Sequence, residues 1–353
     1  MKTRDVYYDN AKFLLIFLVV FGHLIQSYIA ENKFIFTLYT TIYLFHMPAF
    51  ILISGFFAKG FQKKGFVLKI TKKLIGPYLI FQGIYSFYYF FIHDHGWKEL
   101  DPLNPKWSLW FLVSLFCWNI MLFLFTKWKV GFGIFLSITL GIIVGYFEEI
   151  NTYLSMSRTI VFFPLFLIGY YFKKEYFEKL IENKIKIVSV AIFGSMVIFF
   201  YYLPEFDYKW LFGSEPYDDL HLSGINGGIV RIGVYTLTIL ATFSFFAFVP
   251  RKNHFFTKWG TSSLYVYLLH GFFIKLFRNS ELVDYFNKPW QMVILFAISL
   301  LLIAFLSSNM VIAIFQPFIE LKISVLRNYL TTAYSKLKSR KLITANMEER
   351  GTH

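Results

Sequence analysis

Long apolar runs separated by short polar or basic segments form the main pattern of the chain. Windows of roughly 18 to 22 apolar residues recur about ten times, a length that crosses the hydrocarbon core of a bilayer as a helix. The sequence therefore predicts an all-α, polytopic membrane helical bundle of about ten transmembrane helices. The windows lie near residues 12–30, 35–57, 74–92, 108–126, 130–147, 157–172, 185–203, 228–249, 262–278 and 290–318.

The second window contains Pro48 and the sixth contains Pro164. A proline frees a backbone carbonyl, which a membrane helix tolerates where neighbouring helices satisfy that group. Their presence favours a bundle with an internal cavity.

Composition agrees with a membrane protein. Hydrophobic residues make up 57% of the chain, and the mean hydropathy is +0.54. The single cysteine, Cys117, excludes an internal disulfide and a thiolate metal cluster. The sequence has no G-x-S-x-G, H-E-x-x-H or Walker-type motif, which argues against soluble-type hydrolases, zinc proteases and ATPases.

The charge distribution predicts an orientation. With a cytoplasmic N-terminus and an even number of spans, about 26 of the 35 Lys and Arg residues fall on the inside. Both termini are therefore expected in the cytoplasm. The basic residues are scattered through short loops with no nucleic-acid-binding module, so we expect no nucleic acid and instead anionic lipid head groups and an anionic cytosolic ligand as partners.

The chain is expected to form one integral membrane domain, residues 1–319, and a basic cytoplasmic tail, residues 320–353. No small-residue cleavage site follows the first apolar run, which predicts a retained first span. The tail shows the pattern of an amphipathic helix on the cytoplasmic leaflet. Its apolar positions are Leu326, Leu330, Ala333 and Leu337.

Asp9, Lys12 and His23 lie in and next to the first apolar window. On a helix, Lys12 and His23 are about 20° apart around the axis and roughly 16 Å apart along it, with Asp9 about 40° from His23. Ionisable groups at membrane depth are costly unless they face a cavity or a partner, so this stripe is a candidate functional site. The alternative is a structural polar contact between helices.

Several short blocks, in order and spacing, resemble one known family. Together they are similar to the acyltransferase-3 family of multi-pass membrane O-acyltransferases, particularly its fucose 4-O-acetylase-like branch, over nearly the whole chain. The blocks are Asp9, Lys12 and His23; Phe45-His46-Met47-Pro48-Ala49-Phe50 with Ile53-Ser54-Gly55-Phe56; Lys72-Lys73-Leu74-Ile75-Gly76-Pro77-Tyr78; Trp110-Phe111-Leu112; Phe163-Pro164-Leu165-Phe166 with Gly169-Tyr170; and Ser263-Leu264-Tyr265-Val266-Tyr267-Leu268-Leu269-His270.

The resemblance implies an enzyme that transfers an acyl group, usually acetyl, from cytosolic acyl-CoA to a hydroxyl of a cell-surface or lipid-linked glycan. It implies acetyl-CoA as a donor substrate, no permanently bound cofactor, and a multi-pass location in a cell membrane, which we expect to be a bacterial plasma membrane. Some relatives carry an additional extracytoplasmic esterase-like domain. We therefore expect either that the membrane domain completes the transfer or that a separate extracytoplasmic partner does so.

Donor binding is expected on the basic side. Acyl-CoA carries several phosphate charges, which a basic cluster at the entry to the third span would attract. Lys12, Lys72 and Lys73 are the candidate donor-binding residues, together with their neighbours Lys63, Lys64 and Lys69. Many relatives have arginine where Lys12 stands, and lysine lacks the planar bidentate fork. For the lysine cluster, ordinary positive-inside topology is the alternative.

His23 is the leading candidate for the catalytic base that deprotonates the acceptor hydroxyl, or for a group that briefly carries the acyl unit. Asp9 and Lys12 are expected to position the helix terminus and the donor. His46 is a candidate second proton carrier or oxyanion partner. The alternative for His46 is a hydrogen bond that satisfies carbonyls freed by Pro48.

Trp110, Tyr265 and His270 are the candidate substrate-binding residues. Trp110 can stack on a sugar or adenine ring, and Tyr265 and His270 are expected on the acceptor side. Interface anchoring for Trp110 and ordinary aromatic packing for the ninth window are the alternatives. A glycan or lipid-linked sugar transporter or flippase is the alternative function, although the two-fold internal symmetry typical of such proteins is not evident in the sequence.

Overall fold

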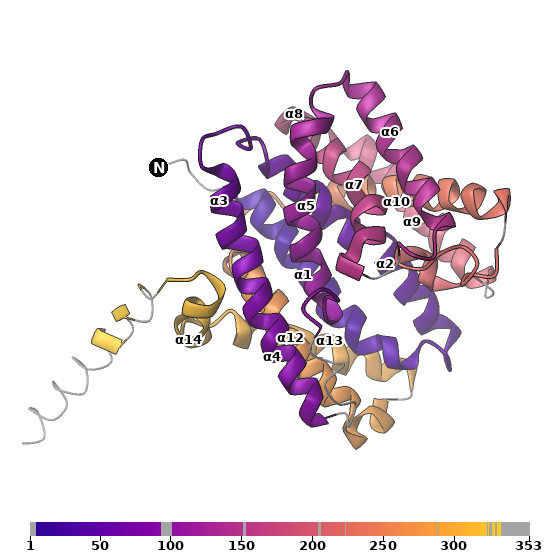
Figure 1. Ribbon diagram of the computed structural model, residues 1–353. Helices are drawn as coiled ribbons and strands as arrows, with labels where there is room; N and C mark the ends of the chain where they lie inside the picture. Colours follow the sequence, from indigo (N-terminus) through magenta and orange to yellow (C-terminus); the bar gives the residue numbers. More distant parts are fainter. Residues whose placement is uncertain are drawn as a thin grey trace, which may run out of the picture.

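The computed structural model describes residues 5–92, 101–150, 153–203, 206–222, 224–286, 288–322, 324, 327–328 and 330–332. In this part of the chain the regular structure is helical, with no strand, which confirms the predicted all-α fold (Figure 1). The α-helices are α1 Val6–Ile25, α2 Lys33–Phe57, α3 Phe66–Ile70, α4 Gly76–Ile92, α5 Trp110–Phe125, α6 Val130–Ile143, α7 Met156–Tyr171, α8 Lys174–Leu180, α9 Asn183–Tyr202, α10 Ile225–Phe248, α11 Thr257–Gly260, α12 Ser263–Arg278, α13 Met292–Leu306 and α14 Asn309–Ile319.

Polar caps fix where the two central helices begin. The Asp5 side chain accepts a hydrogen bond from the Tyr7 backbone N–H at the start of α1, at 3.2 Å. At the start of α2, Asn32 accepts from two backbone N–H groups, at 2.9 and 3.2 Å. Each cap satisfies amides that have no partner within the helix, so the apolar runs that follow begin at defined residues.

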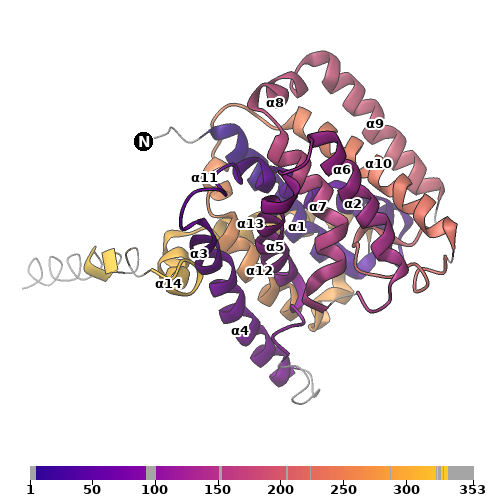
Figure 2. The same cartoon turned by 45° about the horizontal axis from the view of Figure 1, so that its top comes forward.

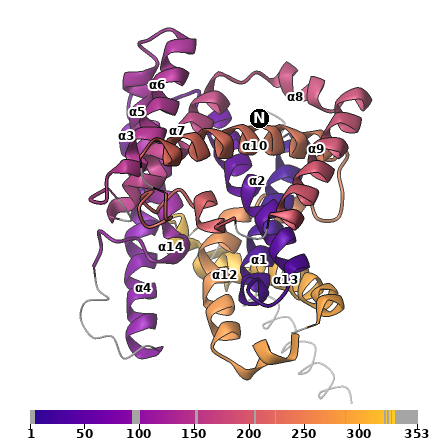
Figure 3. The same ribbon diagram turned by 90° about the vertical axis from the view of Figure 1, so that its right-hand side faces the viewer.

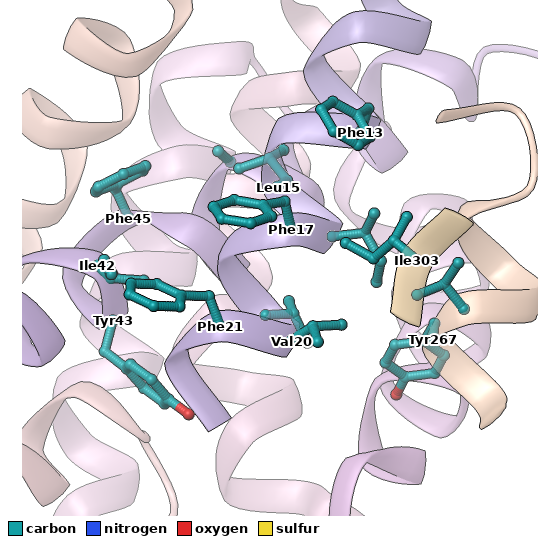
Figure 4. Close-up of a cluster of buried hydrophobic side chains, with 14 of the residues drawn as sticks. Phe13, Leu15, Phe17, Val20, Phe21, Ile42, Tyr43, Phe45, Tyr267 and Ile303 are labelled. Carbon is teal, nitrogen blue, oxygen red and sulfur yellow. The ribbon is translucent and has the colours of Figure 1, made fainter. Parts of the chain in front are cut away.

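Helix α1 forms the centre of the hydrophobic core. Figure 4 shows its side chains between Ile42 and Phe45 of α2 on one side and Ile303 of α13 on the other. Phe17 and Phe21 lie in this layer and stack on each other at 5.7 Å. Because apolar contact surrounds most of α1, its polar residues must find partners or a cavity within the protein.

Helices α2 and α7 lie side by side in close contact (Figure 2). A side-chain carbon at Gly169 would meet the carbonyl of Leu52, and one at Gly55 would meet the carbonyl of Phe166. Glycine at both positions therefore lets the two backbones touch, as small residues commonly do between membrane helices. This contact fixes α7, which carries Arg158 and Phe162, against α2, which carries His46.

Six helical segments of the described residues are long and apolar enough to cross a membrane, or seven if the bent pair α13 and α14 forms one span. About ten spans were predicted. All ten windows fall on helices, but α4, α6 and α12 have 17, 14 and 16 residues, and α13 and α14 meet at 67°. The chain is a multi-pass membrane protein.

The outer helices differ from this core. Helix α9 lies at the edge of the bundle in Figures 2 and 3, with only 17% of its most apolar stretch buried. Helix α14 ends at Ile319, where the predicted membrane domain ends. The predicted amphipathic tail helix lies largely outside the described residues, and its placement remains a prediction.

Candidate active site: adjoining cavities and paired histidines

A cavity of about 270 Å³ lies between α1, α2, α7, α12 and the start of α5. Its wall combines imidazole, phenol and cationic side chains with aromatic rings, and the described residues contribute no Asp or Glu to it. The polar and tryptophan residues of this wall, which we call the histidine cavity, are His23, Gln26, Tyr43, His46, Trp107, Ser108, Trp110, Arg158, Tyr267, Lys275 and Arg278.

Two imidazoles and one indole are grouped at this cavity. The rings of His23 and His270 stack with centroids 5.7 Å apart, and the Trp107 ring lies 4.7 Å from His23 and 5.1 Å from His270. Trp107 has φ of 46°, an uncommon backbone conformation for a non-glycine residue. The turn that ends the loop before α5 thus places this side chain between helices α1 and α12.

Backbone carbonyls determine the proton positions on two of the histidines. His46 Nδ1 lies 2.9 Å from the Ile42 carbonyl, and His270 Nδ1 lies 3.0 Å from the Val266 carbonyl. A carbonyl only accepts, so each ring donates its Nδ1–H and, when neutral, leaves Nε2 with a free lone pair. His46 is also part of the cavity wall.

His23 has a different partner. Its Nδ1 lies 3.0 Å from the Tyr43 hydroxyl, which can donate or accept. When Nδ1–H donates to the hydroxyl, Nε2 is the basic nitrogen. Arg278 donates to the His23 backbone carbonyl at 2.6 Å and to Gln26 Oε1 at 2.7 Å, which ties the end of α1 to the end of α12.

Two further cavities adjoin the first. A cavity of about 180 Å³ shares Val19, Met47 and Tyr267 with it and is lined mostly by apolar side chains, with Lys12 in its wall; we call it the middle cavity. A third cavity, of about 620 Å³, shares Ser54, Phe57, Phe111 and Leu264 with the middle cavity. We call it the lysine cavity, because Lys63, Lys64, Lys69 and Lys73 line it.

Lys12 is held by its own helix. Its ammonium lies 3.2 Å from Asp9 Oδ1 and 5.3 Å from the centre of the Phe57 ring. Asp9 is 4% exposed and lies where α11 approaches α1, since a side-chain carbon at Gly260 would meet the Asp9 carbonyl. The Asp9 carboxylate therefore positions Lys12, which is the only cation that the described residues contribute to the middle-cavity wall.

The acyltransferase-3 family model, described as "Acyltransferase domain", matches residues 5–308. The chain belongs to the acyltransferase-3 family. A stretch of 62 residues is 48% identical to the nodulation protein NolL of Sinorhizobium fredii (strain NBRC 101917 / NGR234) and 45% identical to the nodulation protein NolL of Mesorhizobium japonicum. Each match covers 17% of this chain and 17% of the relative, and no solved structure matches. The description of the family model indicates transfer of an acyl group from an acyl donor.

The lysine cavity lies around and just beyond the end of α2. Lys59 lies in the loop after α2, between two residues of the cavity wall, and donates to the Phe172 carbonyl at 2.8 Å. Burial lowers the pKa of its amine. Lys72 is exposed on the turn 71–75 and is not part of the cavity wall, whereas Lys73 is. Two of the three predicted donor-binding lysines, Lys12 and Lys73, therefore face the cavities.

The acceptor-side candidates take different positions. The Trp110 ring lines the histidine cavity and is contacted by the Arg158 guanidinium at 5.2 Å and by Phe162 at 5.8 Å. His270 is fully buried behind His23. Tyr265 donates to Glu320 at 2.8 Å and is not in the wall of any of the three cavities, whereas Tyr267, two residues later, lines two of them.

The alternative for His46 can be compared with its observed contact. Pro48 lacks the N–H that would reach the carbonyl of Leu44, four residues earlier. His46 instead contacts the carbonyl of Ile42. The proline and the histidine are thus neighbours in sequence, but His46 does not satisfy the group that Pro48 leaves without a donor.

Among the wall residues of the histidine cavity that sequence reasoning missed, five contribute a cation or an aromatic ring beside His23 or Trp110. Arg158, Lys275 and Arg278 are cations within or at the end of predicted spans, so the argument applied to Lys12 would have found them. Trp107 and Tyr43 gave no such signal, because aromatic residues make up 22% of the chain. Among the described residues, no group of three or more His, Cys, Asp or Glu side chains is arranged to hold a metal ion.

Proposed function

We propose that this acyltransferase takes an acetyl group from cytosolic acetyl-CoA and transfers it to a hydroxyl of a cell-surface or lipid-linked glycan. One observation carries the proposal: the lysine, middle and histidine cavities adjoin in that order. A long donor with an anionic head and a reactive thioester end fits this order. Membership of the acyltransferase-3 family supports two parts of the proposal, an acyl donor and a transfer reaction.

The lysine cavity is the proposed site of the nucleotide phosphates. Four ammonium groups in its wall give charge-assisted contacts to phosphate oxygens. They come from the loop 58–65, from helix α3 and from the π-helical segment Thr71–Ile75. The apolar middle cavity then suits the thinner arm that links the nucleotide to the thioester. Lys12 lies there about 16 Å before His23 along α1, by helical rise.

In the proposed reaction, the acceptor hydroxyl attacks the thioester carbonyl while an imidazole Nε2 accepts its proton. The tetrahedral intermediate collapses as the C–S bond breaks, and the protonated imidazole returns the proton to the departing CoA thiolate. His23 is the proposed base. His46, whose Nε2 lone pair is fixed by the Ile42 carbonyl, is the proposed second proton carrier. A brief acyl-imidazole on His23 is the alternative path to the same products.

We further propose a multi-pass location in a bacterial plasma membrane with both termini cytoplasmic. This orientation puts the lysine cavity on the cytosolic side, where acyl-CoA is made available, and the histidine cavity towards the outer side. Anionic lipids are expected partners of the basic loops, and a separate extracytoplasmic protein is a proposed partner in completing transfer.

The test uses the purified full chain in lipid nanodiscs with acetyl-CoA carrying a labelled acetyl group. We expect thioester cleavage, and labelled glycan when membranes of a glycan-producing host are added. The His23→Ala variant is expected to lose at least about 100-fold in rate, the scale of general acid–base catalysis. His254→Ala is the matched control, because His254 is exposed on the loop before α11 and stacks on Phe256.

A His23→Ala protein that inserts normally and transfers acetyl at the wild-type rate would contradict the role of His23. No thioester cleavage by the wild type in the presence of those membranes would contradict acetyl-CoA as the donor. A surface glycan that gains the same acyl groups with and without the protein would contradict the proposed acceptor class.

A further inference from the structure

Three cations line the histidine cavity, and no carboxylate of the described residues lies in its wall. Arg158 comes from α7, and Lys275 and Arg278 come from α12. Within the described part of the chain, none of them has an acidic side chain at ion-pair distance. An excess of three positive charges in a partly enclosed membrane cavity is unfavourable unless a bound anion offsets it.

The contacts of these cations are with neutral groups. Arg158 donates to the Phe212 carbonyl and to Ser214 Oγ, each at 3.3 Å, and Lys275 lies 5.3 Å from the Tyr89 ring centre. The nearest acid to Arg158 in this network is Glu215, which accepts from Ser214 Oγ at 3.1 Å and is not in the cavity wall.

Arg278 has donor capacity left over. One of its terminal nitrogens makes both contacts to α1, with the His23 carbonyl and Gln26. Its Nε is buried and makes no hydrogen bond within the described residues. A guanidinium that is positioned by neutral groups and still has N–H donors is suited to bind an oxyanion in two-point geometry.

We propose that the histidine cavity binds an acceptor that is a phosphorylated saccharide, with its phosphate or diphosphate at Arg158, Lys275 and Arg278. A phosphate ester with a charge near −2 offsets three cations better than a single carboxylate does. Because the same wall holds His23 and His46, a hydroxyl of the attached sugar then lies beside the base. This inference rests on the proposed function for the direction of transfer, but the anion site itself does not.

The donor's own phosphates are the competing occupant of these cations. The order of the cavities assigns the donor's phosphates to a different site. The lysine cavity has four ammonium groups of its own, and it adjoins the histidine cavity through the middle cavity. The experiment therefore lowers the lysine cavity's charge first, by replacing two of its four lysines. Lys63→Gln/Lys73→Gln is the background into which every further substitution is placed.

Binding of inorganic pyrophosphate to the full chain in nanodiscs is measured by titration calorimetry at fixed ionic strength. In the background variant we expect pyrophosphate to bind, and adding Lys275→Gln or Arg158→Gln to raise its dissociation constant about tenfold, as for loss of one charge-assisted contact. Lys33→Gln is the matched control, because Lys33 is exposed at the start of α2 and its ammonium lies 4.4 Å from the centre of the Tyr201 ring. Arg278→Gln also removes the contacts that hold the end of α1. If the Arg278→Gln variant fails to fold, Lys275→Gln is the variant that tests the anion site.

Pyrophosphate that does not bind the background variant, or binds all cavity variants equally, would overturn the proposal.

A competition experiment distinguishes the possible sources of the phosphate. Displacement by UDP-glucose indicates a nucleotide sugar, displacement by polyprenyl phosphate in the nanodisc lipid indicates a lipid-linked sugar, and displacement by neither would overturn the saccharide phosphate. Thioester cleavage is measured on the same preparations, so loss of the proposed function leaves the anion result readable on its own.

Discussion

His23 on α1 and His270 on α12 stack with ring centroids 5.7 Å apart, although they are 247 positions apart in the sequence. His270 has its Nδ1–H fixed by a carbonyl, and the Tyr43 hydroxyl lies against His23. Two adjacent imidazoles disfavour protonation of both at once. In the proposed reaction, the partner of His23 Nδ1 decides which nitrogen accepts the proton.

The first prediction concerns the Tyr43 hydroxyl. Tyr43→Phe removes the group 3.0 Å from His23 Nδ1, so the ring loses the contact that orients it. We expect kcat to fall about tenfold, within the range for general acid–base catalysis, with KM for acyl-CoA unchanged. Steady-state kinetics checks this, with Tyr28→Phe as control, since that hydroxyl donates to the Val283 carbonyl instead. An unchanged kcat in Tyr43→Phe would refute the orienting role.

The second prediction concerns Lys12. Lys12→Gln removes the ammonium from the middle cavity, and we expect KM for acyl-CoA to rise about tenfold, because one charge contact to the donor is lost. The same change removes the cation 3.2 Å from the buried Asp9, so thermal stability should also fall. Lys12→Gln/Asp9→Asn should recover stability but not KM. Recovery of both would mean that Lys12 acts only as the partner of Asp9.

Fold class, family and the ten apolar windows followed from the sequence because each depends on local pattern. The spacing of Lys12 and His23 on one helix was also local, and the structure places both side chains in adjoining cavities. The number of full-length spans did not follow, because hydropathy detects apolar length but not where a helix is bent or shortened. The 67° bend between α13 and α14 within one apolar window is the clearest case.

The partners of His23 lie beyond what one sequence reveals. Trp107 was missed and Trp110 chosen, although they are three positions apart, because the turn before α5 decides which indole reaches α1. Arg278 meets the His23 carbonyl across 255 positions. The sequence pattern shows which face of a helix is polar. Helix packing decides which residues of other helices contact that face.

The third prediction tests the contact of α2 with α7. Gly169→Ala places a carbon against the Leu52 carbonyl, where backbone cannot yield easily. We expect a loss of about 1–3 kcal/mol in stability, the usual cost of overpacking. Thermal unfolding in nanodiscs measures it. Gly194→Ala is the matched control on α9, where the added carbon meets open space, and it should be neutral or slightly stabilising. Equal melting temperatures for the two variants would refute the close contact.

The fourth prediction concerns Arg231, which is 2% exposed in α10. It donates to the Trp210 carbonyl at 2.9 Å and lies over the rings of Trp210 and Tyr217, so it anchors the segment 208–217. That segment supplies Leu211 and Phe212 to the histidine cavity. Arg231→Met should increase hydrogen exchange there and raise KM for the acceptor, leaving KM for acyl-CoA unchanged. Unaltered exchange in residues 208–217 would rule out the anchoring role.

The last prediction separates catalytic geometry from stability. Gly271 on α12 lies against the Trp107 indole and the Tyr85 hydroxyl, and an added carbon would push both side-chain ends. Because Trp107 contacts His23 and His270, Gly271→Ala should displace the indole and lower kcat by about tenfold, the scale of a disturbed general base. Alanine gains up to about 1 kcal/mol over glycine in a helix, which offsets part of the strain, so melting should change little. Gly233→Ala, whose added carbon meets no neighbour, is the control. A large fall in melting temperature with full activity in the folded fraction would show that Gly271 serves packing and that the position of Trp107 does not govern the reaction.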